Sequence, residues 1–305
     1  MGHGGWKQRF RWLCLRLLGY YVLIVLGIAL FQRHLIYRPT RVALIPAQAA
    51  GFAPDAIHDV VLTTDDGLEL HGWHLLPTGK RCHDSASCDA ELQAAQRVVL
   101  YFPANMGNRS DRAAECASFT ALDAHVLLFD YRGYGENPGT PGEEALARDA
   151  HAVWNYAINV RGLAPERIIL FGESLGGGVA TRLAAELCDA RTPPAGLILS
   201  GTFSSLADTG ANLYPWLPVR LLLVDCFPSE SRMAKVSCPV LQFHGDRDEI
   251  VPFQLGSRLF EAVPARSSSG IARQFVKVVG GGHNDFPEPT FREPIREFFE
   301  TVKNR

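Results

Sequence analysis

Hydrophobic residues are concentrated most strongly near the N-terminus of the chain. No residue from 17 to 31 is charged, and the segment 12–31 would form a helix about 30 Å long, enough to cross the hydrocarbon core of a bilayer. Arg16 would extend its side chain toward the membrane interface. We therefore expect residues 1–40 to form a membrane anchor that contacts the bilayer through residues 12–31. Aromatic residues flank the run at positions that suit the two interfaces, namely Trp6, Phe10, Trp12 and Tyr37.

A cleaved signal peptide is the main alternative for this segment. An Ala-Gln-Ala sequence at 47–49 resembles a cleavage site, but it lies 16 residues beyond Phe31, which is farther than in secretory signal peptides. A buried core helix is a second alternative, and the cations on both sides of the run disfavour it. The spacing therefore favours an uncleaved anchor.

Beyond residue 41 the pattern alternates between strands and helices. Residues 57–63 and 68–77 are separated by Asp-Asp-Gly and predict a hairpin. After the hairpin, short apolar runs typical of buried strands alternate with segments whose apolar residues have helical spacing. This alternation predicts an α/β domain over 41–305, with a mostly parallel twisted sheet and helices on both faces. The further expected strands cover 97–102, 125–130, 167–171, 196–199, 240–243 and 274–279, and the expected helices cover 143–160, 175–187, 255–263 and 291–302.

Residues 202–235 interrupt this alternation. They contain Tyr214-Pro215-Trp216 and the apolar run 219–224, and we expect them to form a short lid over one end of the sheet. Two interpretations of these apolar side chains stay open. They line a pocket for an acyl chain, or they are ordinary core residues, because an apolar run alone does not identify a pocket.

Charge is distributed unevenly along the chain. Residues 1–54 carry seven basic side chains and no acidic one, whereas the remainder carries 23 basic and 32 acidic residues, a net charge of −9. Binding to nucleic acid needs a basic face, so an acidic body argues against it. Four basic residues precede the apolar run and three follow it. The positive-inside rule then favours a cytoplasmic N-terminus with the body on the external or periplasmic side.

The sequence Gly172-Glu173-Ser174-Leu175-Gly176 directly follows an expected strand and precedes an expected helix. In that context the G-x-S-x-G pattern predicts a nucleophile elbow, because a serine on such a strained turn needs neighbours without bulk. The hydroxyl would project above the sheet at the helix N-terminus, where amide dipoles stabilise negative charge. We therefore predict Ser174 as a nucleophile. The same string lacks the glycine spacing of a dinucleotide site and the Lys-Ser or Lys-Thr of a P-loop.

A serine nucleophile needs a base, and the base needs an orienting acid. His283 follows three glycines in a loop just after the last expected strand, where an imidazole can reach the sheet edge. The acid belongs between serine and histidine in the chain. Residues 244–252 follow another strand and offer Asp246, Asp248 and Glu249. We select Asp248, because an aspartate directly after glycine, as Asp246 is, more often shapes a turn.

Catalysis of acyl transfer also needs backbone donors for an oxyanion. The amide that follows the nucleophile, Leu175 N–H, is one expected donor, and the loop after the third strand supplies the second. In that loop we select the Asn105 backbone N–H, with Met106 as the neighbouring alternative.

Seven cysteines are present, and two of them lie in the polar stretch 80–96. In an oxidising compartment Cys82 and Cys88 would close a small loop. A metal site that combines them with His83 is the alternative, but the spacing matches no zinc pattern. We therefore expect no metal and no organic cofactor.

These motifs resemble the α/β-hydrolase superfamily, and more narrowly its membrane-anchored serine hydrolases of the alpha/beta hydrolase domain group. In that group the third-strand loop usually reads His-Gly-Asn-x-Gly-Asn, whereas this chain has Pro103 and Ala104 in place of the first two residues. The resemblance implies that Asp130 and the turn after it flank the site without taking part in the chemistry. The strings that carry the resemblance are residues 31–39, 130–135, 172–177, 244–248 and 282–283.

The sequence therefore predicts a membrane-anchored serine hydrolase that cleaves an ester or thioester of a small-molecule or lipid-like acyl substrate through Ser174, His283 and Asp248. A serine peptidase on the same fold is one alternative, for which Glu173 or Asp285 would recognise an amine. A non-catalytic binding or scaffold protein is another, supported only by the altered 103–104 pair.

Overall fold

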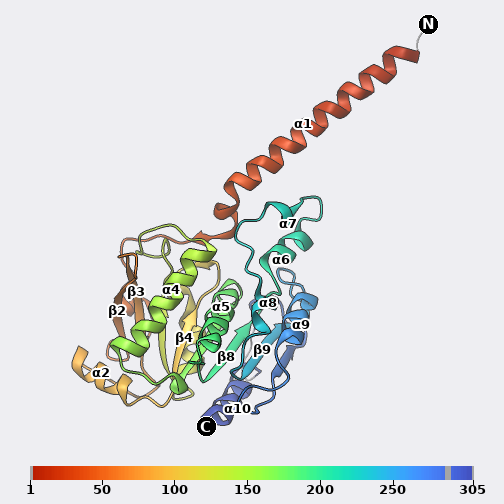
Figure 1. Ribbon diagram of the computed structural model, residues 1–305. Helices are drawn as coiled ribbons and strands as arrows, with labels where there is room; N and C mark the ends of the chain where they lie inside the picture. Colours follow the sequence, from red (N-terminus) through yellow and green to blue (C-terminus); the bar gives the residue numbers. More distant parts are fainter. Residues whose placement is uncertain (1–2, 286–289, 304–305) are drawn as a thin grey trace.

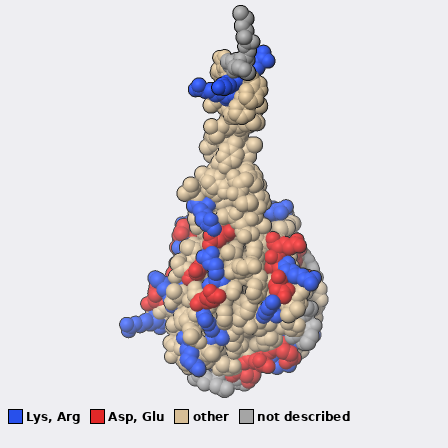
Figure 2. Space-filling model, turned by 90° about the vertical axis from the view of Figure 1, so that its right-hand side faces the viewer, with Lys and Arg blue, Asp and Glu red and all other residues tan. Residues whose placement is uncertain are grey.

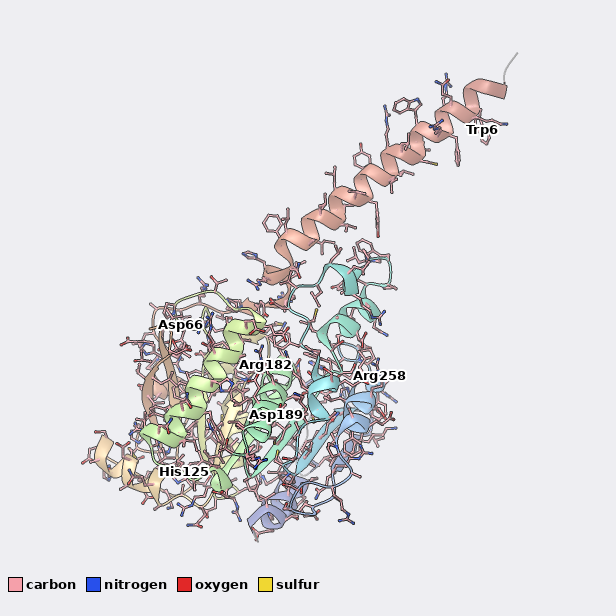
Figure 3. The ribbon with its side chains drawn as sticks, viewed as in Figure 1. Trp6, Asp66, His125, Arg182, Asp189 and Arg258 are labelled. Carbon is pink, nitrogen blue, oxygen red and sulfur yellow. A yellow bond between two sulfur atoms is a disulfide. The ribbon has the colours of Figure 1, made fainter. Side chains whose placement is uncertain are left out.

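A long helix projects from an α/β body in the computed structural model, which describes residues 3–285 and 290–303 (Figure 1). Helix α1, His3–Ile36, is 34 residues long. Its Trp6–Ile36 portion is long and apolar enough to cross a membrane, and no residue of its most apolar window is buried. The stick view shows side chains pointing outward all around this helix as far as Trp6 (Figure 3). An apolar helix exposed along this length is not the core helix that was the second alternative.

The body is built on an eight-stranded sheet with the order β10-β9-β8-β7-β4-β6-β3-β2. Strand β3 pairs antiparallel with both β2 and β6, and all pairs from β6 to β10 are parallel. The predicted mostly parallel sheet is confirmed. The strands are β2 Ile57–Thr63, β3 Glu69–Leu75, β4 Val98–Phe102, β6 His125–Phe129, β7 Ile168–Glu173, β8 Gly196–Ser200, β9 Val240–Gly245 and β10 Gln274–Val278.

Helices cover both faces of this sheet, because its central strands are apolar on both sides. In β4, Leu100 belongs to one buried cluster while Val99 and Tyr101 belong to the other. Side chains from α4, α5 and α9 complete the first cluster, and side chains from α3 and α10 complete the second. These helices are α3 Ala113–Thr120, α4 Glu143–Asn155, α5 Leu175–Asp189, α9 Phe253–Ala262 and α10 Arg292–Lys303.

Several short elements were not anticipated from the sequence. A helix, α2 Ser85–Gln93, forms within the polar stretch 80–96, and its first turn is closed by a capping box between Asp84 and Ser87. The strands β1 Arg38–Pro39 and β5 Met106–Gly107 form a separate two-stranded sheet. Residues 202–235 contain α6 Leu206–Leu213, α7 Val219–Leu222 and α8 Ser229–Met233. The remaining short helices are η1 Ala47–Ala50, η2 Arg109–Arg112, η3 Tyr156–Val160 and η4 Pro165–Arg167.

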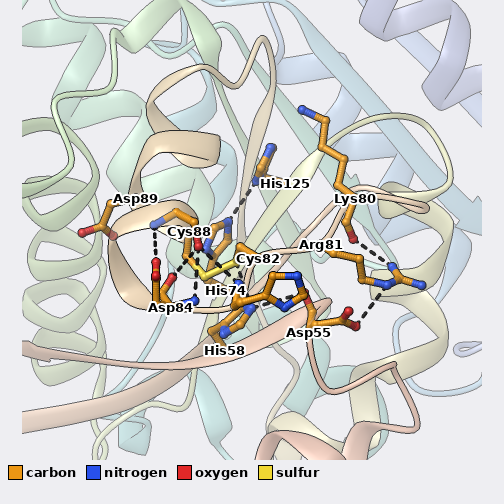
Figure 4. The surroundings of a disulfide bond; sticks show 12 residues. Asp55, His58, His74, Lys80, Arg81, Cys82, Asp84, Cys88, Asp89 and His125 are labelled. Atoms are coloured by element: carbon orange, nitrogen blue, oxygen red, sulfur yellow. Dashed lines mark hydrogen bonds and ion pairs between the residues drawn. A yellow bond between two sulfur atoms is a disulfide. The ribbon is translucent and has the colours of Figure 1, made fainter.

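Cys82 and Cys88 form a disulfide that holds the start of α2 against the body (Figure 4). Both cysteines are buried. His58, rather than the expected His83, lies beside the sulfurs, with its Nε2 3.0 Å from Cys82 Sγ. Sulfurs that are bonded to each other are not metal ligands, because only the thiolate binds metal.

Two buried histidines face each other behind this disulfide. His74 Nε2 of β3 and His125 Nδ1 of β6 are 2.9 Å apart, at the end of the body away from α1 (Figure 3). Burial lowers the pKa of His74 to about 3 and that of His125 to about 4. Both rings are therefore neutral in the folded protein at pH values where they would be protonated in the unfolded chain.

This difference predicts that the folded state loses stability as the pH falls from about 6.5 to about 4, where the unfolded chain binds more protons. Each histidine contributes a slope of up to about 1.4 kcal/mol per pH unit. In His125→Asn the loss between about pH 7 and about pH 5 is expected to shrink, as measured by chemical unfolding of the full chain in detergent. His83→Asn, at an exposed position, serves as the control. Equal slopes in both variants would contradict the assignment.

Candidate active site

Ser174 lies at the turn between β7 and α5, in a backbone conformation that side chains other than glycine rarely adopt. Its φ is 51° and its ψ is −113°, and it directly precedes the first residue of α5. The Ser174 N–H donates to the Ser200 carbonyl of β8 at 2.8 Å, which holds the turn against the neighbouring strand. A strained residue persists only where its surroundings fix it. The side chain is thereby presented at the carboxyl edge of the sheet.

The glycines around Ser174 allow the first turn of α5 to lie directly on the sheet. A Cβ at Gly176 would collide with the Phe102 carbonyl of β4, which is backbone that cannot move aside. A Cβ at Gly177 would collide with the Thr202 side chain, whereas one at Gly178 would lie 3.1–3.3 Å from two phenylalanine rings. The predicted need for residues without bulk therefore has a specific cause at each position.

The structure brings together the three side chains selected from the sequence. His283 Nε2 is 2.9 Å from Ser174 Oγ, and His283 Nδ1 is 2.7 Å from Asp248 Oδ2. The Asp248 side chain is fully buried, and its second oxygen accepts the backbone N–H of Ile250 and of Val251 at 2.9 and 2.7 Å. A carboxylate held by these donors can fix the orientation of an imidazole.

The other acids of the same loop lie elsewhere. Asp246 Oδ1 accepts the Gly280 N–H at 2.7 Å, and Lys277 lies 3.2 Å from its other oxygen. The Gly280 hydrogen bond is the largest cause that lowers the pKa of Asp246. Glu249 is exposed. The structure thus places Asp246 in a turn, as expected, and joins it to the loop that carries His283.

Of the two residues selected as oxyanion donors, Leu175 directly follows Ser174, and Asn105 lines the same cavity as Ser174. Leu175 is the first residue of α5, where N–H groups have no acceptor within the helix. Among residues 3–285 and 290–303, no hydrogen-bond acceptor is found for the Asn105 N–H. The rest of Asn105 is tightly held. Its side chain donates to the Ile36 carbonyl at 2.6 Å, and its carbonyl accepts Arg38 N–H at 2.9 Å and the Tyr134 hydroxyl at 2.8 Å.

Asp130 is hydrogen-bonded to Arg109, which follows this loop in the chain, rather than to Ser174. It is buried and accepts the backbone N–H and the guanidinium of Arg109 at 2.7 and 2.6 Å. Burial raises the pKa of Asp130 to about 6 against the lowering effect of Arg109. Asn137 donates to the Asp130 carbonyl at 2.6 Å. The turn after Asp130 is therefore structural in its contacts, as the resemblance implied.

Ser174 opens into a cavity of about 810 Å³ that is lined mainly by apolar side chains. Its walls come from five separate parts of the chain, among them α1 with Ile28 and Leu35, the loop after β4 with Asn105, and the region between α6 and α7 with Trp216. His34 and Arg38 are the ionisable side chains among its described lining residues, and no acidic side chain is among them. A cavity of this size accommodates a drug-sized or lipid-like ligand.

Sequence reasoning missed the contribution of the anchor segment to this cavity. Tyr37, which we expected at a membrane interface, is buried and donates its hydroxyl to Asp225 at 3.0 Å. Arg33 donates to the same carboxylate at 2.9 and 3.1 Å. The polar residues that end the apolar run were the available signal, and they had been interpreted only as flanks of a membrane helix.

Comparisons with known proteins agree with this architecture. Residues 96–228 match the family model described as serine aminopeptidase, S33. An uncharacterized protein of Mycobacterium tuberculosis is 40% identical over 267 residues, which cover 86% of this chain and 85% of that protein. The lysophosphatidylserine lipase ABHD12 of Danio rerio is 31% identical over 301 residues, covering 90% and 78% of the two chains.

The chain belongs to the α/β-hydrolase superfamily. It is a serine hydrolase of the esterase or lipase type. Solved structures agree on the fold of this hydrolase. An α/β hydrolase of Vibrio vulnificus superimposes with a TM-score of 0.67 at 18% identity, covering 90% of this chain and 92% of that one. An esterase of Pyrococcus furiosus gives a TM-score of 0.61 at 18% identity, covering 87% and 98%.

The three consecutive glycines of the hydrolase elbow predict a graded series of alanine substitutions. Gly176→Ala meets backbone and is expected to destabilise the fold by more than about 3 kcal/mol, the upper range for overpacking. Gly177→Ala meets the buried Thr202 side chain rather than backbone and is expected to cost less. Gly178→Ala is expected to stay within about 1 kcal/mol, since alanine's helix propensity offsets the tight ring contacts. Thermal unfolding of the full chain in detergent measures this order, and a reversed order would refute the packing explanation.

Proposed function

We propose that this serine hydrolase is anchored in a membrane and cleaves a carboxylic ester or thioester of an acyl or lipid-like substrate, with Ser174, His283 and Asp248 as its catalytic residues. One observation carries the proposal. Ser174, His283 and Asp248 form a hydrogen-bonded chain, and its serine lines a large, mainly apolar cavity. A nucleophile, its base and an orienting acid in this order are the arrangement that acyl transfer requires.

The reaction follows from these contacts. Ser174 Oγ attacks the carbonyl carbon while His283 Nε2 accepts the hydroxyl proton, and Asp248 stabilises the imidazolium that forms. The amides of Leu175 and Asn105 donate to the oxyanion of the tetrahedral intermediate. His283 then gives its proton to the leaving alcohol or thiol, which leaves an acyl-enzyme on Ser174. A water that His283 deprotonates then attacks the acyl-enzyme, and His283 returns the proton to Ser174 Oγ as the carboxylic acid leaves.

Substrates with an acyl chain suit the apolar lining best. Leu206, Leu213 and Leu223 are among the side chains that face the cavity. The lipase name of the zebrafish relative and the esterase name of the Pyrococcus structure point in the same direction. His34 and Arg38 are the basic residues of the lining, and they would suit a polar or anionic group at the other end of the substrate.

A peptidase activity has less support in the contacts of the residues that would recognise an amine. Glu173 is already paired with Arg112 at 3.0 Å and accepts the Tyr101 hydroxyl at 3.0 Å. Asp285 Oδ2 accepts the Gly282 N–H at 3.0 Å, next to His283. Neither carboxylate stands free beside Ser174 to bind an amine. A non-catalytic scaffold protein would not need the hydrogen bonds that join Ser174, His283 and Asp248.

The proposed organisation has an anchor over residues 1–40 and a hydrolase domain over 41–305, with a lid at about 202–235. Two features support a cytoplasmic N-terminus and an external body. More basic residues precede the apolar run than follow it. The Cys82–Cys88 disulfide lies in the body, and disulfides persist in oxidising compartments.

The catalytic roles predict a sharp contrast between two neighbouring aspartates. Asp248→Asn is expected to lower kcat on a para-nitrophenyl ester at least about 1,000-fold, because the imidazole loses its orienting carboxylate. Asp246→Asn is the matched control and is expected to stay within about fivefold, since an amide oxygen can still accept the Gly280 N–H. Equal losses in the two variants would contradict the assignment of Asp248.

Ser174→Ala is expected to abolish both ester hydrolysis and labelling by a fluorophosphonate probe. A para-nitrophenyl series from acetate to palmitate measures how kcat/KM depends on acyl length in the wild type. The apolar cavity predicts an optimum beyond the shortest esters, because each buried CH₂ contributes about 0.8 kcal/mol of binding. Residual labelling of Ser174→Ala would refute the nucleophile, and a steady fall from acetate onward would refute an acyl-binding cavity.

The proposed orientation predicts a specific count of reactive thiols. When cells are quenched in acid and the denatured chain is alkylated, Cys14, Cys116, Cys188, Cys226 and Cys238 are expected to react at once. Cys82 and Cys88 are expected to react only after a dithiol reductant is added. Mass spectrometry of the intact chain counts the labels. Alkylation of all seven before reduction would place the body in a reducing compartment.

A further inference from the structure

Part of the lid beside α1 has an exposed apolar surface. We call residues 213–224 the lid tip; they run from the last residue of α6 through α7 to Val224. Arg220 is its one charged residue, and its guanidinium donates to Asp208 at 2.8 Å. On the face shown in Figure 2, the surface between the cations at the far end of α1 and the charges of the body carries no charged residue. The exposed apolar side chains of the lid tip are Leu213, Tyr214, Trp216, Leu221 and Val224.

The lid tip runs alongside the second half of α1 and is hydrogen-bonded to it. The Tyr21 hydroxyl donates to the Trp216 carbonyl at 2.9 Å. Eleven residues later, the Gln32 side chain donates to the Leu222 carbonyl at 3.2 Å and accepts the Val224 N–H at 2.8 Å. At 1.5 Å per residue these contacts span about 16 Å of the helix axis. The position of α1 in a membrane therefore determines the position of the lid tip.

The charges on α1 restrict that position. A hydrocarbon core of about 30 Å needs about 20 helical residues. A core that ended before Tyr21 would enclose Lys7, Arg9, Arg11 and Arg16, and charges at the centre of a membrane helix are strongly disfavoured. A core over the residues 12–31 leaves those cations at or near the interface, but it also includes Tyr21 and the part of the lid tip that is bonded to it.

Most of the backbone N–H groups of the lid tip have partners that suit such an environment. In hydrocarbon, each backbone polar group needs an internal partner. Pro215 and Pro218 have no N–H, and the Val224 N–H donates to Gln32. The N–H groups of Tyr214, Leu217, Val219, Leu221 and Leu223 all donate to nearby carbonyls of the chain.

We propose that the lid tip is embedded in the hydrocarbon of the leaflet next to the body, and that the cavity opens there between the lid tip and α1. This inference rests on the membrane anchor of the proposed function. Ile28 of α1 and Leu213 and Trp216 of the lid tip line the same cavity as Ser174. An acyl chain can therefore reach Ser174 directly from the leaflet, without first crossing water.

Photocrosslinking in bilayers tests the position of the lid tip. A benzophenone amino acid replaces Leu221, Ile24 or Val160 of the full chain, which is reconstituted with phosphatidylcholine that carries an alkyne at the end of its acyl chains. Ile24 lies on the exposed surface of α1. Val160 is exposed at the end of η3, which directly follows α4, whereas Glu143, whose N–H donates to Asp225, is at the other end of α4. We expect lipid adducts at 24 and 221 and none at 160.

The outcomes separate the two proposals. An adduct at 24 without one at 221 would overturn the embedded lid tip and leave the anchor intact. No adduct at 24 would refute the anchor, and the embedded lid tip with it. A crosslink from 221 to a second copy of the chain in place of lipid would show that another protomer covers this surface, and it would also overturn the inference.

Activity on two forms of substrate gives a second, independent test. Val224→Asp introduces a charge on the lid tip, outside the cavity lining, and Val160→Asp is the matched control because both valines are 66% exposed. We expect Val224→Asp to lower hydrolysis of a long-chain ester presented in vesicles at least fivefold, while hydrolysis of soluble para-nitrophenyl butyrate stays within twofold. Equal rates of Val224→Asp and Val160→Asp on the vesicle substrate would overturn the inference, and the soluble ester reports that each variant is folded.

Discussion

The close contact between the first turn of α5 and strand β4 is the constraint on which the site depends. Gly176 has no Cβ, so the helix N-terminus lies directly on the Phe102 carbonyl, and the chain must turn sharply at Ser174. Such a backbone conformation costs on the order of 1–3 kcal/mol and persists because the flanking strand and helix are both fixed in the core. The turn lies at the carboxyl edge of a parallel sheet. The loops after β4, β9 and β10 end at the same edge, and these loops supply Asn105, Asp248 and His283.

A second constraint joins the anchor to the body. The buried carboxylate of Asp225 accepts hydrogen bonds from Arg33 and Tyr37 at the end of α1 and from the Glu143 N–H at the start of α4. A buried charge is tolerated when it is paired and hydrogen-bonded, and losing one partner is costly. Directly after this point, Arg38 pairs with the loop that contains Asn105. The end of the anchor therefore holds both the lid and the loop of the expected oxyanion donor.

The elements that could be predicted from the sequence are those with local signals. The strand 57–63 was predicted with its observed bounds, and the helix after Ser174 begins at Leu175 as expected. Asp248 could be selected over Asp246 because a glycine before an aspartate indicates a turn. The burial of Tyr37 could not be predicted, because it depends on Asp225, 188 residues away. Helix α2 was missed because its composition is polar, and its stability comes from a capping box and a disulfide.

The composition of the cavity wall makes the anchor part of the enzyme rather than a tether. Residues from Ile28 to Arg38 form one side of the cavity, and residues of the lid tip form the side facing them. A body that began at residue 41 would keep Ser174, Asp248 and His283, but it would lose that wall and both cationic side chains that line the cavity. It would also lose the partners Arg33 and Tyr37, so that the Asp225 carboxylate would keep only the Glu143 N–H of the bonds described above. The chemistry of the elbow can survive such a truncation, whereas the proposed recognition of an acyl chain depends on contacts that α1 provides.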